Sequence, residues 1–400
     1  REPFNQVTVT NLKPLKPYIM KKIMLIGFSI LSLLTVQVNA QEEKTLKVNP
    51  TGRILMDGGL FHSDNKEFVD GVAIPDARVG VKASYGKFKA KVDIGYAYGK
   101  ISLKDIFVER QLSSHSLLRV GNFVHQFGLQ SSTSSSMKVT MEEPTSNEAF
   151  FNSRLIGAMY VYDKGSFFGT ASVHVESEAL KKKSNELGKM GYGAMSRLVY
   201  RPLRNDGALF QVGISGGYET PRYNSNEELN HTSFDLGANF PTRIAKVRAV
   251  NALITDAKNL FKFTPELVAA YGPVALESQY YFLQVNREKG FTNYKASGVY
   301  GILRGLVIGG DYKHSHTDCG IATPAPGSLE CVLGYNYTDM SDAKAEIYGG
   351  RLNDVSFTVN YYLNKYMIWR FRYSYTRTTN RQGFDNESLN AFQTRFQIIF

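Results

Sequence analysis

Beyond residue 40 the sequence lacks any apolar run of about eighteen residues, the length that a transmembrane helix requires. A shorter apolar stretch lies near the amino end, where a short MKK segment precedes IMLIGFSILSLLTVQV, and it is too short and wrongly flanked for a lasting membrane helix. A basic start, a short apolar run and a small-residue ending predict a secretory signal peptide that is cleaved after Ala40. We expect 1–19 to be an upstream extension, so that residues 1–40 are absent from the mature protein.

Cysteine and histidine are scarce, with two and seven residues in a chain of 400. An exported chain meets an oxidising compartment, so we expect Cys319 and Cys331 to form one disulfide across a loop rich in proline and glycine. His314 and His316 lie nearby, but a zinc site needs more free ligands than these residues offer. We therefore predict no metal site and no cofactor.

Acidic residues are fewer than basic ones, at 36 against 47, which gives a formal net charge of +11. Removal of residues 1–40 takes away five basic residues and one acidic residue, and leaves +7. The basic residues are spread along the mature chain and form no dense patch, and export separates the protein from nucleic acid. We therefore exclude nucleic acid as a partner.

Aromatic residues are abundant, with 24 tyrosines and 25 phenylalanines, although the mean hydropathy is slightly negative. Many of them alternate strictly with polar residues, as in KFKAKVDIGYAYG, DVSFTVNYYL, YMIWRFRYSY and the final NAFQTRFQIIF. This alternation predicts β-strands with one apolar face and one polar face. A soluble β-protein shows the same pattern in any single strand, so the number and spacing of the strands must decide the class.

We expect about sixteen strands, an even number, each long enough to cross a bilayer at a tilt. They lie near 52–62, 74–85, 88–99, 101–112, 115–126, 153–163, 166–177, 190–202, 207–220, 258–271, 273–286, 291–304, 329–340, 350–363, 366–378 and 389–400. Tight links such as YGKF and DKGS alternate with longer polar loops. The pattern predicts an all-β fold, a transmembrane antiparallel barrel over 52–400 with short periplasmic turns and long external loops, after a short periplasmic segment 41–51. The link 305–328 is long where we expect a turn, and a hairpin through LVIGGDY would change the strand count.

Several stretches resemble the phosphate-selective porin O and P family of outer-membrane channels. They are DARVGVKASYGKFKAKVDIGYAYG, LRVGNFVHQFGLQSSTSSSMKVTMEEP, YGPVALESQYYF and GGRLNDVSFTVNYYLN. The resemblance implies a sixteen-stranded homotrimeric porin in the outer membrane of a Gram-negative cell, with inward loops that narrow the pore and basic side chains that guide anions. This chain departs from the family at His125 and Gln126, where proline is common before FGL, and at Glu143 after Glu142, where a basic residue is common.

The polar face of each strand of such a barrel lines the lumen. In the strands with clear alternation, this face carries one acidic residue, Asp93, against eight basic ones: Arg78, Lys82, Lys89, Lys91, Arg119, Arg370, Arg372 and Arg395. A net positive wall raises the local concentration of anions. We expect some of these cations to pair with the loop acids Glu142, Glu143 and Glu148.

Two loops are candidates for the constriction. The serine-rich loop 127–152 is the expected main constriction, and an external loop without contacts is the alternative. The stretch GANFPTRIAKVRAV brings Arg243, Lys246 and Arg248 into the fifth external loop. The resemblance implies that these residues descend into the pore, whereas the alternative is that they are solvated loop charges.

The sequence thus predicts a passive, anion-preferring diffusion channel, with outer-membrane lipid and small anions such as phosphate as partners. A general porin for small polar solutes is the alternative. A barrel enzyme would use residues such as His115, His125, His174 and Asp93, but seven histidines in 400 residues need no catalytic explanation and no acidic cluster has the spacing of a metal site. We therefore predict no enzyme. A barrel that anchors surface partners is disfavoured, because 41–51 is too short for a binding domain.

Overall fold

The structure is a computed structural model that describes residues 45–400 apart from 66, 152–153 and 317. The predicted signal peptide and upstream extension, residues 1–40, lie outside the described residues. The first strand begins at Lys47, within the segment 41–51. Among the described residues, no helix is long and apolar enough to cross a membrane.

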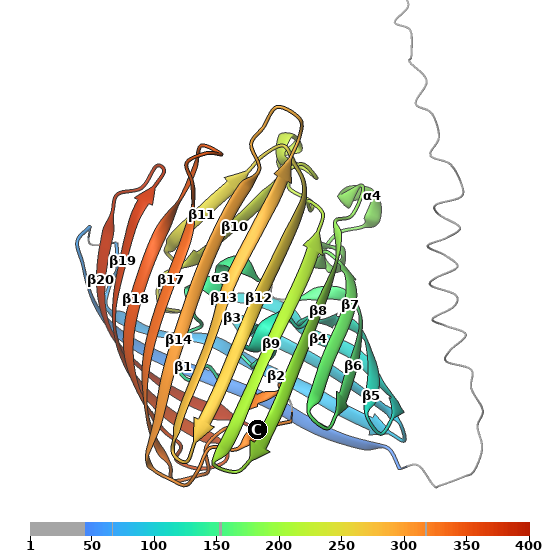
Figure 1. The fold of residues 1–400 in the computed structure, drawn as a ribbon, viewed down its shortest axis with the longest axis vertical. Coiled ribbons are helices and arrows are strands. Elements are labelled where there is room, and N and C mark those ends of the chain that lie inside the picture. The colour runs from blue at the N-terminus through green and yellow to red at the C-terminus, as the bar shows by residue number, and fades with distance from the viewer. Residues whose placement is uncertain (1–44, 66, 152–153, 317) are drawn as a thin grey trace, which may run out of the picture. The chain divides into compact units, whose positions relative to one another are not determined.

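Sixteen strands of the described chain pair antiparallel with their neighbours and form a closed barrel, which confirms the predicted fold class and strand number (Figure 1). In ring order they are β1 (Lys47–Ser63), β2 (Gly71–Tyr85), β3 (Phe88–Ala97), β4 (Lys100–Ser113), β5 (Ser116–Phe123), β6 (Leu155–Lys164), β7 (Phe167–Val175), β8 (Tyr192–Asn205), β9 (Ala208–Glu219), β12 (Ala257–Tyr271), β13 (Val274–Arg287), β14 (Tyr294–Ile308), β17 (Leu329–Asp342), β18 (Ile347–Tyr361), β19 (Met367–Arg381) and β20 (Glu387–Ile399).

Each strand presents one face to the lumen and one to the outside, as the alternation predicts. In β19 the exposed outer positions carry Trp369 and Phe371, while Arg370 and Arg372 between them are buried on the lumen side. A β-strand turns successive side chains to opposite faces, so a sequence of alternating rings and arginines folds with the rings outside. The outer surface is therefore apolar, as contact with lipid requires.

The last strand closes the barrel against the first. Pairing runs from Arg53 opposite Ile399 to Ser63 opposite Leu389. Beyond β20, Phe400 and Gly52 exchange two backbone hydrogen bonds of 2.9 and 3.0 Å, and the Phe400 ring stays half-exposed. The alternating carboxyl end thus removes the free sheet edges that an open sheet would leave.

Links at the two rims of the barrel differ in length. At the rim where β1 begins and β20 ends, most turns are of two residues, and glycines such as Gly207 and Gly272 occupy them with φ of +72° and +54°. Such φ values suit glycine because it has no Cβ. The longest link at this rim is loop 309–328, where β14 ends at Ile308 and a small hairpin follows without joining the barrel, so the strand count stays at sixteen.

Three long loops fold into the lumen and carry most of the remaining elements (Figure 1). Loop 124–154 contains α2 (Gly128–Ser132) and α3 (Thr145–Phe150), loop 220–256 contains the 3-10 helix η2 (Glu227–Leu229) and the hairpin of β10 (Phe234–Asn239) and β11 (Arg248–Ile254), and loop 309–328 contains the hairpin of β15 (His314–Ser315) and β16 (Gly320–Ile321). A further external loop carries η1 (Ser177–Leu180) and α4 (Ser184–Leu187).

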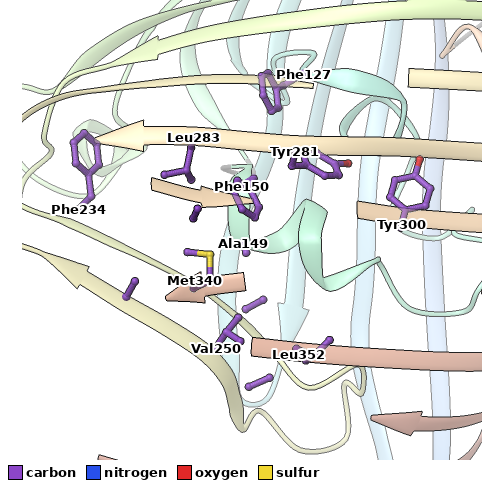
Figure 2. Close-up of a cluster of buried hydrophobic side chains, with 14 of the residues drawn as sticks. Phe127, Ala149, Phe150, Phe234, Val250, Tyr281, Leu283, Tyr300, Met340 and Leu352 are labelled. Carbon is purple, nitrogen blue, oxygen red and sulfur yellow. The ribbon is translucent and has the colours of Figure 1, made fainter. Parts of the chain in front are cut away.

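The hydrophobic core lies between these loops and one side of the barrel. Figure 2 shows Phe150 of α3 and Val250 of β11 near Tyr281 of β13 and Leu352 of β18. All four side chains are at most 3% exposed, and each contributes roughly 1.5–3 kcal/mol by its burial. This packing holds loops 124–154 and 220–256 against β13 to β18. The opposite side of the lumen stays free of it.

The predicted disulfide is wrong, because both cysteines are free. Cys319 is fully buried in loop 309–328, inside the barrel. Cys331 is partly exposed on β17 and shares its outer face with Leu333 and Tyr335. The barrel wall separates the two thiols. Their closeness in sequence suggests a disulfide but does not tell on which side of the wall each thiol lies.

We predict that both thiols react with maleimide after denaturation without reductant. Mass spectrometry should show two additions, and a sample reduced beforehand should show the same two. Two additions only after reduction would contradict the free thiols.

Candidate functional site: the pore cavity

A cavity of about 680 Å³ lies between the strands β1 to β5 and the inward loops. Its floor and walls include the final residues of β20, the serine-rich part of loop 124–154 and part of loop 309–328. Nine basic residues line it: Arg53, Arg78, Lys82, Lys91, Arg119, Lys138, Arg154, Arg304 and Arg370. Six acidic residues line it as well: Asp93, Asp105, Glu143, Glu148, Glu277 and Asp318.

The wall formed by β1 to β5 is basic but largely paired. Lys91 contacts Asp93 at 2.6 Å and Asp105 at 2.7 Å, and Arg154 contacts the same Asp105 at 2.7 Å. Arg119 pairs with Glu109, and its guanidinium carbon lies 4.3 Å from the ring centre of Phe107. Partly exposed pairs of this kind contribute little to stability, but they fix the positions of the charges.

Arg53 joins this wall to loop 124–154. It pairs with Asp76, which also accepts a hydrogen bond of 2.8 Å from Nε of Arg78. Across the cavity, Arg53 donates to the hydroxyls of Ser134 at 3.3 Å and Ser135 at 2.8 Å. The serine and threonine run 131–136 therefore presents hydroxyl groups beside guanidinium groups, both of which can bind anionic oxygens.

Two further cations line the cavity without a carboxylate within 4.0 Å among the described residues. Lys138 is 4% exposed and donates to the backbone oxygen of Gln130 and, at 3.0 Å, to its side-chain oxygen. Arg370 is 1% exposed and donates to the backbone oxygens of Lys138 at 2.8 Å and Ser136 at 3.1 Å. Burial lowers the pKa of Lys138.

A buried ion-pair cluster anchors the middle of loop 124–154 to the closing strand. Arg395 of β20 binds Asp57 of β1 at 2.7 and 2.5 Å, Glu142 at 2.6 Å, and the backbone oxygen of Met141 at 2.6 Å. Burial acts to raise the pKa of Glu142, but Arg395 and then Arg243 outweigh it, and the net shift is downward. The loop is therefore held at this point by a carboxylate that stays ionised.

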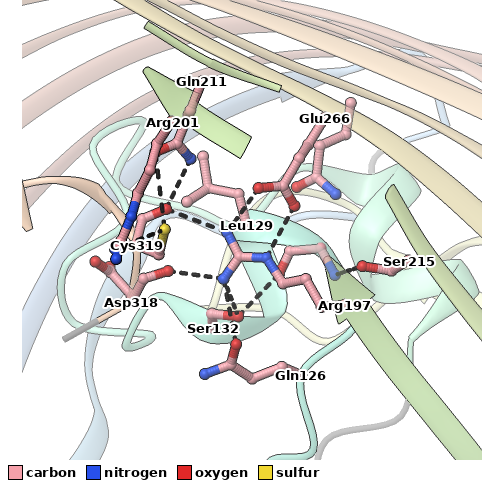
Figure 3. Close-up of polar contacts among 12 residues, drawn as sticks. Gln126, Leu129, Ser132, Arg197, Arg201, Gln211, Ser215, Glu266, Asp318 and Cys319 are labelled. Atoms are coloured by element: carbon pink, nitrogen blue, oxygen red, sulfur yellow. Dashed lines mark hydrogen bonds and ion pairs between the residues drawn. The ribbon is translucent and has the colours of Figure 1, made fainter. Parts of the chain in front are cut away.

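A second cluster joins two inward loops to the wall (Figure 3). Arg197 of β8 forms a bidentate pair with Glu266 of β12, with contacts of 2.7 and 3.0 Å. Its remaining donors reach Ser132 of loop 124–154 at 3.0 Å and the backbone oxygen of Asp318 at 2.7 Å. Gln211 donates to the backbone oxygen of Cys319 at 2.7 Å. One arginine thus positions both loops that bound the cavity.

Five of the eight strand cations predicted to line the pore do line this cavity: Arg78, Lys82, Lys91, Arg119 and Arg370. Arg372 and Arg395 face the lumen but are buried, Arg372 against Asp354 at 3.1 Å and the backbone oxygen of Pro241 at 3.1 Å. Lys89 shares the inner face of β3 with Lys91 but lies near the rim, exposed and outside the cavity lining.

The predicted constriction residues also include some that line the cavity and some that do not. Glu143 lines the cavity, whereas Glu142 and Arg243 bind each other at 3.1 Å and do not line it. Lys246 lies over the Tyr98 ring at 4.3 Å, and Arg248, which opens β11, is exposed. Loop 220–256 therefore does fold inward, but its cations lie outside the cavity.

The histidines considered for catalysis are placed apart from the cavity. His125 and His174 are buried, with ring centres 5.2 Å apart, and His125 stacks on Phe123. His115 is in the turn between β4 and β5, and Asp93 is paired with Lys91.

Sequence reasoning missed Arg53, Arg154, Lys138 and Arg304 in the lining and Arg197 in the loop cluster. Alternation would have found three of them, since Arg53 precedes Ile54 and Met56 of the outer face, Arg197 lies between Ser196 and Leu198, and Arg304 of β14 follows the outward Leu303. No strand pattern marks Lys138 or Arg154, which lie in a loop.

A closed barrel with a charged, loop-bounded cavity and an apolar outer surface is the construction of an outer-membrane channel. A family model described as phosphate-selective porin O and P matches residues 62–400, and the chain belongs to this family. It is therefore a porin of the Gram-negative outer membrane. A search of curated proteins finds none that matches.

Solved structures share the fold at low sequence identity. OmpT of Vibrio cholerae, an outer-membrane protein, is 12% identical with a TM-score of 0.58, over 91% of this chain and 100% of that one. A trimer form of OmpT is 13% identical with a TM-score of 0.55, over 89% and 100%. An anion-selective porin from Comamonas acidovorans is 11% identical with a TM-score of 0.55, over 89% and 100%.

We predict that Arg395→Gln destabilises the barrel by about 3–5 kcal/mol, because the buried Asp57 and Glu142 lose their cation. The free energy of unfolding follows from urea titration in lipid vesicles, with the fluorescence of the single tryptophan, Trp369, as the signal.

The control is Arg351→Gln, which breaks an exposed pair with Asp339 and should change the free energy by less than about 1 kcal/mol. Equal effects of the two substitutions would rule out the anchoring role of Arg395.

Proposed function

We propose that this porin is a passive, anion-preferring diffusion channel whose solutes cross the cavity between β1 to β5 and loop 124–154. The observation that carries the proposal is the lining, with nine basic residues against six acidic ones. In a narrow cavity with protein walls, an excess of three positive charges concentrates anions and repels cations. Phosphate is among the expected solutes, because guanidinium and hydroxyl donors meet at Arg53, Ser134 and Ser135.

The conducting roles of Arg78, Lys82, Lys91, Arg119 and Arg370 are part of this proposal, with Arg53 added to them. Arg372 and Arg395 act instead through structure, since each is buried against a carboxylate and a loop oxygen. For Arg243 we propose the same anchoring role through Glu142.

We also propose that the channel carries out no catalysis, works without a cofactor, and forms a homotrimer in outer-membrane lipid. The separation of His115, Asp93 and the buried pair of His125 and His174 supports the first point. The apolar outer face supports the contact with lipid. The trimer form of the similarly folded OmpT supports the third point.

The selectivity should depend on the basic wall. The double variant Arg78→Gln and Lys82→Gln removes two cavity cations, so we expect the ratio of chloride to potassium permeability to fall by about twofold or more. The measurement is the reversal potential of single channels in a planar bilayer under a potassium chloride gradient, followed by titration with phosphate.

Lys344→Gln is the matched control, because Lys344 is an exposed cation in an external loop. A cation-signed reversal potential of the native channel would refute the proposed anion preference. Block by phosphate would add a binding site to the channel, and anion preference without block would make it a general anionic porin.

The anion preference should rise as the solution becomes more acidic. Burial and the neighbouring Glu143 raise the pKa of Glu148 to about 7. Glu148 lines the cavity, so its protonation between about pH 8 and about pH 6 removes a negative charge from the lining. The reversal potential should shift toward the anion over this range in the native channel and stay constant in Glu148→Gln. The same shift in both proteins would assign the pH dependence to another group.

A further inference from the structure

Glu143 and Glu148 are the two partly exposed residues of a loop segment that is otherwise buried. Within 141–150, Glu143 and Glu148 are partly exposed and the other eight residues are buried. Both carboxylates line the cavity. Glu143 accepts a hydrogen bond from the side-chain amide of Asn147, and Glu148 accepts two from Asn239, at 3.3 and 3.1 Å. Neither is within 4.0 Å of a cation among the described residues, so each presents a carboxyl group to the cavity. Because the pKa of Glu148 is about 7, its carboxyl group is ionised at about pH 8.

The segment that carries them is fixed to the side of the barrel opposite the basic wall. Ser146 of α3 donates to Asn336 of β17 through both its backbone nitrogen, at 3.1 Å, and its hydroxyl, at 2.7 Å. Tyr281 of β13 donates to Asn147 at 2.9 Å. In the ring of sixteen strands, β13, β14 and β17 stand eight places from β3, β4 and β5, and four to seven places from β1 and β2, which carry Arg53, Arg78 and Lys82. The carboxylates of the loop therefore face the cations of the wall across the cavity.

The wall keeps an excess of positive charge after its ion pairs are counted. Arg53 and Arg78 share one carboxylate, that of Asp76. Lys82 forms no ion pair among the residues that the structure describes. On or beside the β1 to β5 wall, the lining has six cations and two acids, whereas the rest of the lining has three cations and four acids. The wall is therefore more positive than the rest of the lining, and the resulting electric field orients and attracts a solute that carries both charges at separate ends.

We propose that the cavity favours small zwitterionic solutes, with a carboxylate or phosphate group toward Arg53 and Arg78 and an ammonium group toward Glu143 and Glu148. This inference rests on the proposed diffusion channel and names a solute class for it. The surplus of basic residues sets the preference among simple ions, whereas the separation of the two signs sets the preference for dipolar solutes. Aminated carboxylic acids and short peptides have this chemistry.

The test compares the entry of 6-aminohexanoate, a zwitterion, with that of arabinose, a neutral solute, in a liposome-swelling assay at about pH 8, where Glu148 is ionised. The native channel should admit the zwitterion faster. The double variant Glu143→Gln and Glu148→Gln keeps the oxygen acceptors for Asn147 and Asn239 but removes both charges. We expect it to lower the ratio of the two rates by about threefold, the size of a weak solvated charge contact.

Arg78→Gln should lower the same ratio from the opposite side of the cavity, and Glu186→Gln, at an exposed position in another external loop, should leave it unchanged. If the double variant admits no arabinose, the two single variants provide the ratio. A native ratio of one or less, or a ratio that the carboxylate substitutions do not change, overturns the zwitterion preference. The reversal potential in potassium chloride tests the anion preference separately, so either proposal can fail while the other holds.

Discussion

Buried guanidinium groups hold the inward loops in the barrel, and the cavity exists because of them. Arg395 binds Glu142 and the backbone of Met141, and Arg197 binds Ser132 and the backbone of Asp318. In both cases a wall carboxylate, Asp57 or Glu266, completes the pair. A buried charge without a partner is costly. A loop that moved out of the lumen would leave such an unpaired charge in the barrel wall, so the ion pairs hold the loops in place. A sixteen-stranded barrel with its loops removed would be a wide water-filled channel.

The loops also determine which charged residues of the inner barrel face can interact with a solute. Arg372 and Arg395 belong to the inner face of the barrel, yet loop residues cover them and neutralise Arg395 in part. Among the described residues, the hydrophobic core reaches Phe61 of β1 but includes no residue of β2 to β5. The cations of these strands that line the cavity are Arg78, Lys82, Lys91 and Arg119. The net charge of the protein is therefore a poor guide to its pore, because the uncovered residues determine the field that a solute meets.

The barrel was predictable from the sequence because it depends on a local property. Alternation in YMIWRFRYSY assigns each residue of β19 to a face, and the same rule finds nearly every strand. The site depends on contacts between residues far apart in the sequence. Nothing near Glu142 indicates that it meets Arg395, or near Cys319 that it lies inside the barrel while Cys331 lies outside. Alternation gives the face of a residue but not what covers that face.

The pairing of β1 with β20 has a consequence for biogenesis. The barrel cannot close until the last strand is available, because β1 pairs with β20. The backbone hydrogen bonds between Gly52 and Phe400 join residues that are far apart in the sequence. Contacts between such distant residues form late and slowly. The nascent chain therefore presents open strand edges and aromatic faces throughout its synthesis and transport. Until the ring closes, these edges can pair with the edges of other chains, so closure also ends the period in which the chain is prone to aggregate.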